Sequence, residues 1–206
     1  MIALRRRAHT ATVPEIAPRT HARTVVWLHL APRRRALAAA LLVLSVGCTS
    51  KEKATPTTGD GRVEVGLPAP AYTAVSLNGD SVSLAGQRGK VVLLNIWATW
   101  CHPCRTEIPE LVAIHERYKS RGLELIGVSV DTDGTDETIR SFMADFAMTF
   151  PVWRDPDERI STLFFAVGVP ATFLIDKQGV LRWRKTGPIA PKDSSLTLAI
   201  EHALAQ

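Results

Sequence analysis

The chain has 206 residues, of which 46% are hydrophobic, an ordinary share for a globular protein of one domain with additional segments. Its formal net charge of +5 arises from residues 1–47, which hold eight arginines and a single acid, Glu15. Residues 48–206 hold 17 basic and 19 acidic side chains, so the charge of this part gives no support for nucleic-acid binding.

The N-terminal segment has the pattern of an export signal. Three consecutive arginines precede an apolar run of 11 residues at 36–46. A membrane-spanning helix needs about 20 apolar residues, so we assign residues 1–47 to a leader with a signal peptide. Residues 1–30 resemble neither a signal nor a domain, and we therefore expect translation to start later, near Val25 or Val26.

Cys48 follows a small residue, Gly47, at the end of the apolar run. The segment 44–48 resembles a bacterial lipoprotein signal, in which this cysteine is lipidated and becomes the mature N-terminus. Ordinary signal cleavage and an uncleaved anchor are the alternatives, because Ser45 stands where such signals prefer Leu. Each alternative predicts an extracytoplasmic protein, and the Thr, Pro, Gly and Lys residues of 48–61 indicate a flexible tether.

Residues 62–206 have the pattern of an α/β domain. Asn78-Gly79 between two strand-like runs indicates a hairpin, and the uniformly apolar run 91–97 indicates a central strand covered on both faces. The predicted elements are strands 72–76, 81–84 and 91–97, a helix 103–120, a strand 123–130, a helix 136–146, a short strand 150–153, a short helix 158–166, strands 171–175 and 180–186, and a helix 194–205. This order predicts a mixed central sheet flanked by helices.

Cys101 and Cys104 lie where the strand 91–97 gives way to the helix 103–120. Side chains at i and i+3 of a helix are neighbours, and a disulfide needs Cα atoms about 4.4–6.8 Å apart. The free N–H groups and the dipole at a helix start stabilise a thiolate at Cys101, and the thiolate is the species that attacks a disulfide. The motif therefore predicts a redox-active dithiol.

Zinc binding and an inert structural disulfide are the alternatives for this pair. Structural zinc needs about four ligands, whereas the third cysteine, Cys48, lies far upstream and only His102 and His115 are near in sequence. A disulfide closing a four-residue loop contributes little chain-entropy stabilisation. We predict no metal and no cofactor beyond the Cys101–Cys104 disulfide.

The segment 97–104, Trp-Ala-Thr-Trp-Cys-His-Pro-Cys, together with the element order resembles a thioredoxin fold. The chain is more closely similar to the TlpA/ResA-like extracytoplasmic thiol-disulfide oxidoreductases of the AhpC/TSA-redoxin superfamily. This resemblance implies a thioredoxin fold with an N-terminal β-hairpin and an inserted βα segment. It rests on the segments 65–70, 78–79, 89–97, 107–111, 127–131 and 168–176.

Peroxiredoxins share parts of this fold and are a less favoured alternative. Their peroxidatic cysteine lies in the pattern Pro-x-x-x-Thr-x-x-Cys. Leu94 stands at the Pro position here, and Ala98 stands at the Thr position.

The two cysteines are expected to have different roles. Cys101 follows Trp100 at the helix start, and we expect it to be the exposed, attacking thiolate, with Cys104 as the more buried, resolving thiol. His102 and Pro103 are expected to tune the redox equilibrium, because a protonated His102 would favour the Cys101 thiolate. A solvent-exposed histidine with little effect is the alternative.

Glu107 follows Cys104 by three residues on the same helix face. The resemblance implies an acid here that tunes the cysteine pair, since a carboxylate raises a thiol pKa when charged and relays a proton when neutral. The alternative is a surface charge. Asn95 occupies the position at which cytoplasmic thioredoxins place a buried Asp, and Asn cannot ionise, so Glu107 is the predicted relay.

The resemblance also implies that Pro170 is a cis-proline facing the dithiol. Its conformation would leave the Val169 backbone free to pair with an extended substrate, and Trp100 would border the substrate groove. His115 and His202 lie on predicted helices, and we expect both to be solvated.

These observations predict an exported, monomeric enzyme that reduces protein disulfides. The resemblance implies apocytochrome c or another specific client as the substrate and a membrane thiol relay as the electron donor. A disulfide oxidase or isomerase is the second interpretation. A module that binds client proteins without turnover is the third, and the intact cysteine pair argues against it.

Overall fold

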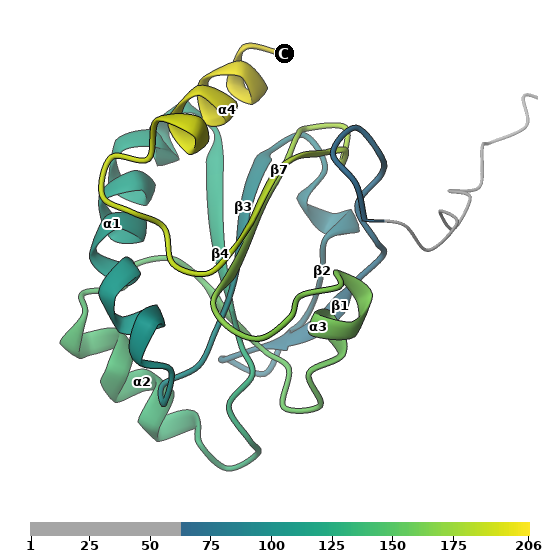
Figure 1. Cartoon of the computed structure of the whole chain (residues 1–206). Coiled ribbons are helices and arrows are strands. Elements are labelled where there is room, and N and C mark those ends of the chain that lie inside the picture. The colour runs from purple at the N-terminus through teal and green to yellow at the C-terminus, as the bar shows by residue number, and fades with distance from the viewer. Residues whose placement is uncertain (1–62) are drawn as a thin grey trace, which may run out of the picture. The chain divides into compact units, whose positions relative to one another are not determined.

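The computed structural model describes residues 63–206 (Figure 1). The predicted leader, the tether and Cys48 lie outside these residues. Within them, no helix combines the length and the apolar character needed to cross a membrane. The elements are β1 (Thr73–Ser76), β2 (Ser81–Ser83), η1 (Ala85–Gln87), β3 (Val91–Trp97), α1 (His102–Tyr118), η2 (Lys119–Arg121), β4 (Leu123–Ser129), α2 (Asp136–Asp145), β5 (Val152–Arg154), α3 (Arg159–Leu163), β6 (Ala171–Ile175), β7 (Leu181–Thr186) and α4 (Ser194–Ala205).

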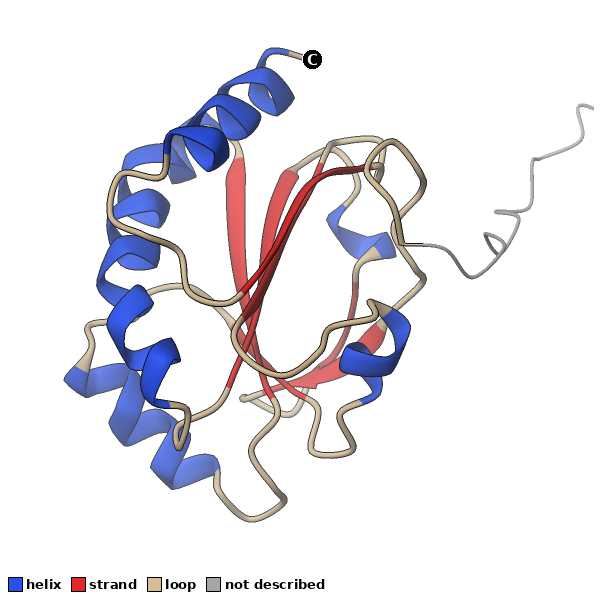
Figure 2. Cartoon of the chain, viewed as in Figure 1, coloured by secondary structure: helices blue, strands red, loops and turns tan. Residues whose placement is uncertain are grey.

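The seven strands form one mixed sheet in the order β2-β1-β5-β4-β3-β6-β7. Strands β3, β4 and β5 are parallel, while β6–β7 and β1–β2 add antiparallel hairpins at the two edges. Helices α1, α2 and α4 lie along one side of the sheet, and α3 lies on the other (Figures 1 and 2). The predicted thioredoxin fold is confirmed, with its N-terminal hairpin and its additional α2–β5 segment.

Strand β3 is the centre of the sheet and leads into the cysteine motif. All seven of its residues are buried, because β4 and β6 pair with its two edges and other elements cover its faces. Its polar member, Asn95, lies in register with Thr172 of β6. At its end, the fully buried Trp97 packs against Phe142 of α2, with ring centres 5.0 Å apart.

The element boundaries differ from the predicted ones by a few residues. Helix α1 ends at Tyr118 and continues as the η2 turn, which stops at Gly122 in the left-handed conformation with φ of 100°. Strand β5 is shifted toward the C-terminus, and α3 spans five residues because Phe164 and Phe165 leave the helical conformation, Phe165 with a positive φ.

The prediction of a solvated histidine is wrong for His115 and right for His202. His115 lies on the face of α1 that packs on the sheet, with its ring 5.8 Å from that of Phe150. Burial lowers the pKa of His115, which favours its neutral form. His202, near the end of α4, is exposed.

Gly127 of β4 lies against the indole of Trp97. A Cβ at this position would lie 2.8 Å from Trp97 Nε1 and 3.3 Å from Phe150 Cε2, and both rings are deeply buried. We expect Gly127→Ala to lower the free energy of unfolding by about 1–3 kcal/mol, because neither ring has space to retreat. The thermal midpoint measured by circular dichroism should fall by several degrees.

Gly86→Ala is the matched control, since its Cβ would meet only Ser83 Oγ, at 3.4 Å. Equal midpoints for the two variants would contradict the expected clash.

Candidate active site

The cysteine motif begins on a short turn between β3 and α1. The Cys101 N–H donates to the carbonyl of Ala98 at 3.2 Å, which closes the turn 98–101. Cys101 is the N-cap of α1, and its Sγ accepts the Cys104 N–H at 3.2 Å. Pro103 lies in the first turn of the helix, where a missing N–H has no cost. Cys101 thus lies at the N-terminus of the helix that follows strand β3, as the sequence predicts.

Cys101 and Cys104 form a disulfide, with Cα atoms 5.3 Å apart. Cys104 is fully buried. The prediction that Cys101 is exposed is wrong in this disulfide form, since only 4% of the residue is accessible. Its Sγ is turned toward the first turn of α1, while the neighbouring Trp100 is 65% exposed. The predicted order of burial between the two cysteines is nevertheless correct.

Glu107 is buried one helical turn after Cys104, with 1% of the residue exposed. Its Oε1 accepts a hydrogen bond from Asn95 Nδ2 and its Oε2 accepts one from the Ile189 N–H, both at 2.8 Å. Asn95 Nδ2 also donates to Thr172 Oγ1 at 3.0 Å, which fixes the amide. Glu107 is therefore part of an internal polar network, and the surface-charge alternative is excluded.

Burial raises the pKa of Glu107 to about 7, against the opposing influence of the Ile189 N–H, the Asn95 amide and the charge of Lys185. Lys185 itself pairs with Asp193, the N-cap of α4, at 2.7 Å. A carboxyl group with this pKa exchanges its proton near neutral pH, where a thiol must lose its proton to become reactive.

The loop between β7 and α4 is bound to two acids of α1. The Ile189 N–H donates to Glu107, and the Lys192 N–H donates to Glu110 Oε1 at 3.1 Å. Residues that follow the cysteines by more than eighty positions thereby complete the surroundings of Glu107.

The Val169–Pro170 peptide bond is cis, as the resemblance implies. Pro170 is buried and Val169 is half-buried at the start of β6. Among the described residues, no backbone hydrogen bond involves the Val169 N–H or carbonyl. The backbone of Val169 is thus unoccupied, while its pairing with a substrate stays a prediction.

His102 and Pro103 are exposed between the two buried cysteines. No ion pair within the part of the chain that the structure describes involves His102. The expected influence of these two residues on the redox equilibrium stays a prediction.

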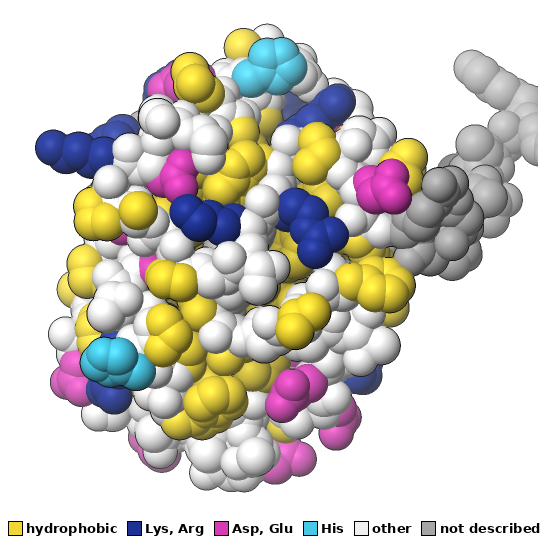
Figure 3. All heavy atoms as spheres, in the orientation of Figure 1, with side chains coloured by type: hydrophobic (Ala, Val, Ile, Leu, Met, Phe, Trp, Pro, Cys, Tyr) yellow, Lys and Arg dark blue, Asp and Glu magenta, His cyan; other side chains and the backbone are white. Residues whose placement is uncertain are grey.

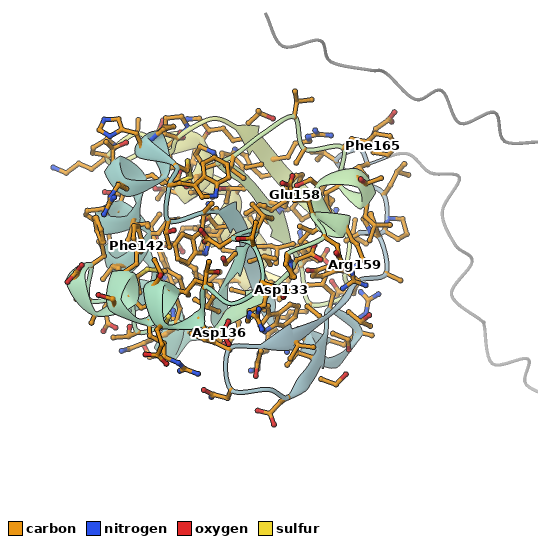
Figure 4. All side chains as sticks on the ribbon, turned by 90° about the horizontal axis from the view of Figure 1, so that it is seen from below. Asp133, Asp136, Phe142, Glu158, Arg159 and Phe165 are labelled. Carbon is orange, nitrogen blue, oxygen red and sulfur yellow. A yellow bond between two sulfur atoms is a disulfide. The ribbon has the colours of Figure 1, made fainter. Side chains whose placement is uncertain are left out.

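A hollow of about 220 Å³ lies beside the turn that carries Cys101. The guanidinium of Arg105 lies 5.0 Å from the ring centre of Phe142, which Figure 4 labels on α2. Trp100 borders this concave surface, although its contact with a substrate stays a prediction. The lining comes from Thr99, Trp100, Arg105, Thr138, Ser141, Phe142 and Asp145.

Apolar side chains are also exposed in the segment that leads to Pro170. Phe165 and Val167 are both largely accessible. Figure 3 shows apolar surface between groups of charged side chains on the face seen in Figure 1, and Figure 4 places Phe165 on the opposite side of the molecule from Phe142.

Two polar partners of the site were not predicted from the sequence. Asp131 binds the turn before Cys101, and Ile189 donates its N–H to Glu107. Asp131 follows β4, whose carboxyl end lies at the same sheet edge as that of its parallel neighbour β3, and this position is a signal that could have identified it. A backbone N–H such as that of Ile189 leaves no signal in the sequence.

Among residues 63–206, no group of three or more His, Cys, Asp or Glu side chains is arranged to hold a metal ion. The chemical groups around the motif are two sulfurs, the carboxyl groups of Glu107 and Asp131, and amides.

Residues 65–184 match the family model described as AhpC/TSA family. The chain belongs to the AhpC/TSA family. Thiol-disulfide oxidoreductase ResA from Bacillus thuringiensis subsp. konkukian is 35% identical to this AhpC/TSA-family protein over 122 residues, which are 59% of this chain and 69% of ResA.

Two solved structures are also similar to this AhpC/TSA-family protein. A putative thiol:disulfide interchange protein DsbE from Chlorobium tepidum superposes with a TM-score of 0.63 and 29% identity, covering 69% of this chain and 99% of that one. A putative protein disulfide isomerase from Bacteroides thetaiotaomicron superposes with a TM-score of 0.63 and 29% identity, covering 70% of this chain and 92% of that one.

The AhpC/TSA-family protein is therefore a thiol-disulfide oxidoreductase of ResA/DsbE type. Cys101 and Cys104 lie at disulfide distance and supply the groups that this activity needs. The resemblance, the fold and the enzyme class predicted from the sequence are confirmed.

Proposed function

We propose that this enzyme reduces disulfides of client proteins outside the cytoplasm. The observation that carries the proposal is the buried Glu107 one turn after Cys104. A negative charge there disfavours a thiolate in the reduced pair. A less stable reduced form makes the dithiol a stronger reductant, the opposite of the situation in strongly oxidising proteins of this kind.

The reaction transfers two electrons from the dithiol to the client. The Cys101 thiolate attacks one sulfur of the client disulfide, forms a mixed disulfide and releases the first client thiolate. Cys104 then loses its proton and attacks Cys101 Sγ, which forms the Cys101–Cys104 disulfide and releases the second client thiolate. The client gains two electrons and two protons, and a donor dithiol must return two electrons to the enzyme.

Glu107 is the proposed acceptor of the Cys104 proton. Its carboxyl group lies on the same helix one turn further on, in a buried network that includes Asn95. With its pKa raised to about 7 by burial, the carboxylate can take a proton and return it at neutral pH.

The proposed client and location rest on the sequence and its resemblance, and not on the structure described for residues 63–206. The resemblance supports apocytochrome c or another specific client protein, and a membrane thiol relay as the donor. The leader 1–47 supports export, and Cys48 supports a lipid anchor that keeps the domain on a tether at the membrane.

The reduction potential of the purified protein against thiol redox buffers tests this direction of electron flow. We expect about −250 mV or lower, close to that of thioredoxin. A potential near about −120 mV would make the protein an oxidant and would overturn the proposed reduction of clients.

A further inference from the structure

The buried acids of the described residues are Glu107, Asp131, Asp155 and Asp176. Asp155 pairs with Arg159 at 3.2 Å and Asp176 pairs with Arg182 at 2.6 Å. No comparable ion pair of Glu107 or Asp131 occurs within residues 63–206. The two buried acids without a paired cation are thus Glu107, one helical turn after Cys104, and Asp131, which binds the turn before Cys101.

Asp131 receives its hydrogen bonds mainly from a single residue of the turn 98–101. The Thr99 N–H donates to Oδ2 at 3.0 Å, and the Thr99 hydroxyl donates to Oδ1 at 2.6 Å. Ser129 Oγ donates to Oδ2 at 2.7 Å. A buried carboxylate without a cation is costly unless donors surround it, and here these donors tie it to the turn that carries Cys101.

The turn 98–101 decides where the sulfur of Cys101 lies. Its closing hydrogen bond, from the Cys101 N–H to the Ala98 carbonyl, leads directly into the N-cap of α1. A thiolate is stabilised by helix N–H groups only while it stays within reach of the first turn. The Val130 N–H donates to the Trp97 carbonyl at 3.0 Å, so β4 is joined to the chain just before this turn as well.

We propose that Asp131 is a positioning residue of this enzyme, which holds the turn 98–101 through Thr99 and so keeps Cys101 Sγ at the N-terminus of α1. Asp131 acts through Thr99 and has no hydrogen bond to the sulfur. The proposal rests on the attacking role of Cys101 in the proposed function.

The placement of Cys101 Sγ and the negative charge of Asp131 have opposite effects on the stability of the Cys101 thiolate. A nearby negative charge disfavours the thiolate, whereas correct placement at the helix start favours it. An Asn at position 131 keeps an oxygen that accepts the Thr99 N–H and removes the charge, while an Ala removes both. The two substitutions therefore separate the two influences.

The test is the rate at which iodoacetamide alkylates Cys101 in the reduced full-length protein, measured across pH with the modified cysteine identified by mass spectrometry. We expect Asp131→Ala to slow the reaction at neutral pH by about fivefold to tenfold and to move its pH midpoint upward. Asp131→Asn should stay within about twofold of the wild type.

Asp155→Ala is the matched control, because it removes another buried carboxylate that binds Arg159 rather than the turn. We expect it to lower thermal stability without moving the pH midpoint of alkylation. Thr99→Val, which removes only the hydroxyl contact, provides a milder variant and should slow alkylation by about twofold to threefold even if Asp131→Ala does not fold.

An alkylation rate of Asp131→Ala equal to that of the wild type would overturn the positioning role. Equal acceleration of Asp131→Ala and Asp131→Asn would also overturn it, because charge alone would then explain the effect. Preferential alkylation of Cys104 in the wild type would instead contradict the attacking role of Cys101 and overturn both proposals.

Discussion

Cys104→Ser is expected to trap the enzyme as a mixed disulfide with its client. Cys101 can still attack from the N-terminus of α1, but no second sulfur remains to release the product. We expect the mixed disulfide to persist longer by on the order of a thousandfold or more, since the resolving step loses its nucleophile. The adduct is measured by non-reducing electrophoresis and mass spectrometry after mixing the reduced variant with a disulfide-containing protein.

Cys101→Ser and the double Cys101→Ser, Cys104→Ser variant should form no adduct. Cys104→Ala serves as a second trap, because a serine hydroxyl at a fully buried position can disturb packing. Adducts of equal lifetime in the wild type and in both traps would show that Cys104 does not resolve the intermediate. Function retained in the double variant would support a module that binds clients without turnover.

Glu107→Gln is expected to slow the resolving step by about a hundredfold and to remove its dependence on pH near neutrality. In the wild type this step should accelerate as pH rises through about 7, because the carboxylate that accepts the Cys104 proton forms over this range. Glutamine cannot take up a proton. Stopped-flow decay of a preformed mixed disulfide measures the rate at each pH.

The stability of the wild-type protein should also change with pH because of Glu107. Burial raises the pKa of Glu107 from 4.5 to about 7, so the folded form binds the proton more tightly than the unfolded form. The contribution of Glu107 to the free energy of unfolding is therefore fully present below about pH 4.5 and is lost as pH rises to about 7. Glu107→Gln should lack this slope, which denaturant titrations at several pH values detect.

Glu110→Gln is the matched control, since Glu110 also accepts an N–H from the loop before α4 but lies one turn further from the cysteines. It should leave the rate of resolution and its pH profile unchanged. Glu107→Ala provides a second test in case the amide of Gln opposes the Ile189 N–H. A wild-type pH profile in both Glu107 variants would rule out the carboxyl group as the relay.

The sequence was sufficient for the parts of this site that depend on local pattern. The apolar run of β3 and the spacing of Cys101 and Cys104 predicted a dithiol at a helix N-terminus, and the structure has both. The sequence did not decide whether Glu107 is buried or exposed, because a helix pattern does not show which loop covers a given face. The loop after β7 closes over it and donates the Ile189 N–H.

Other errors have the same origin in long-range packing. Cys101 follows an exposed Trp100, which suggested that the cysteine is exposed as well, but its sulfur turns inward to accept an N–H of α1. His115 is polar on a helix that is otherwise amphipathic, yet its position faces Phe150 across the core. Asp131 reads as the first residue of a polar loop, and only the parallel pairing of β3 and β4 brings it to Thr99.

The contact between Ile189 and Glu107 has a consequence for what counts as the smallest active piece of this chain. A fragment that ended before β7 would retain Cys101, Cys104 and Glu107, and would therefore still carry the recognisable motif. It would lack the loop that shields the carboxyl group, and water would return the acidity of Glu107 toward that of a free glutamate. The cysteine motif is local in the sequence, but the surroundings that raise the pKa of Glu107 come from residues between Asn95 and Ile189.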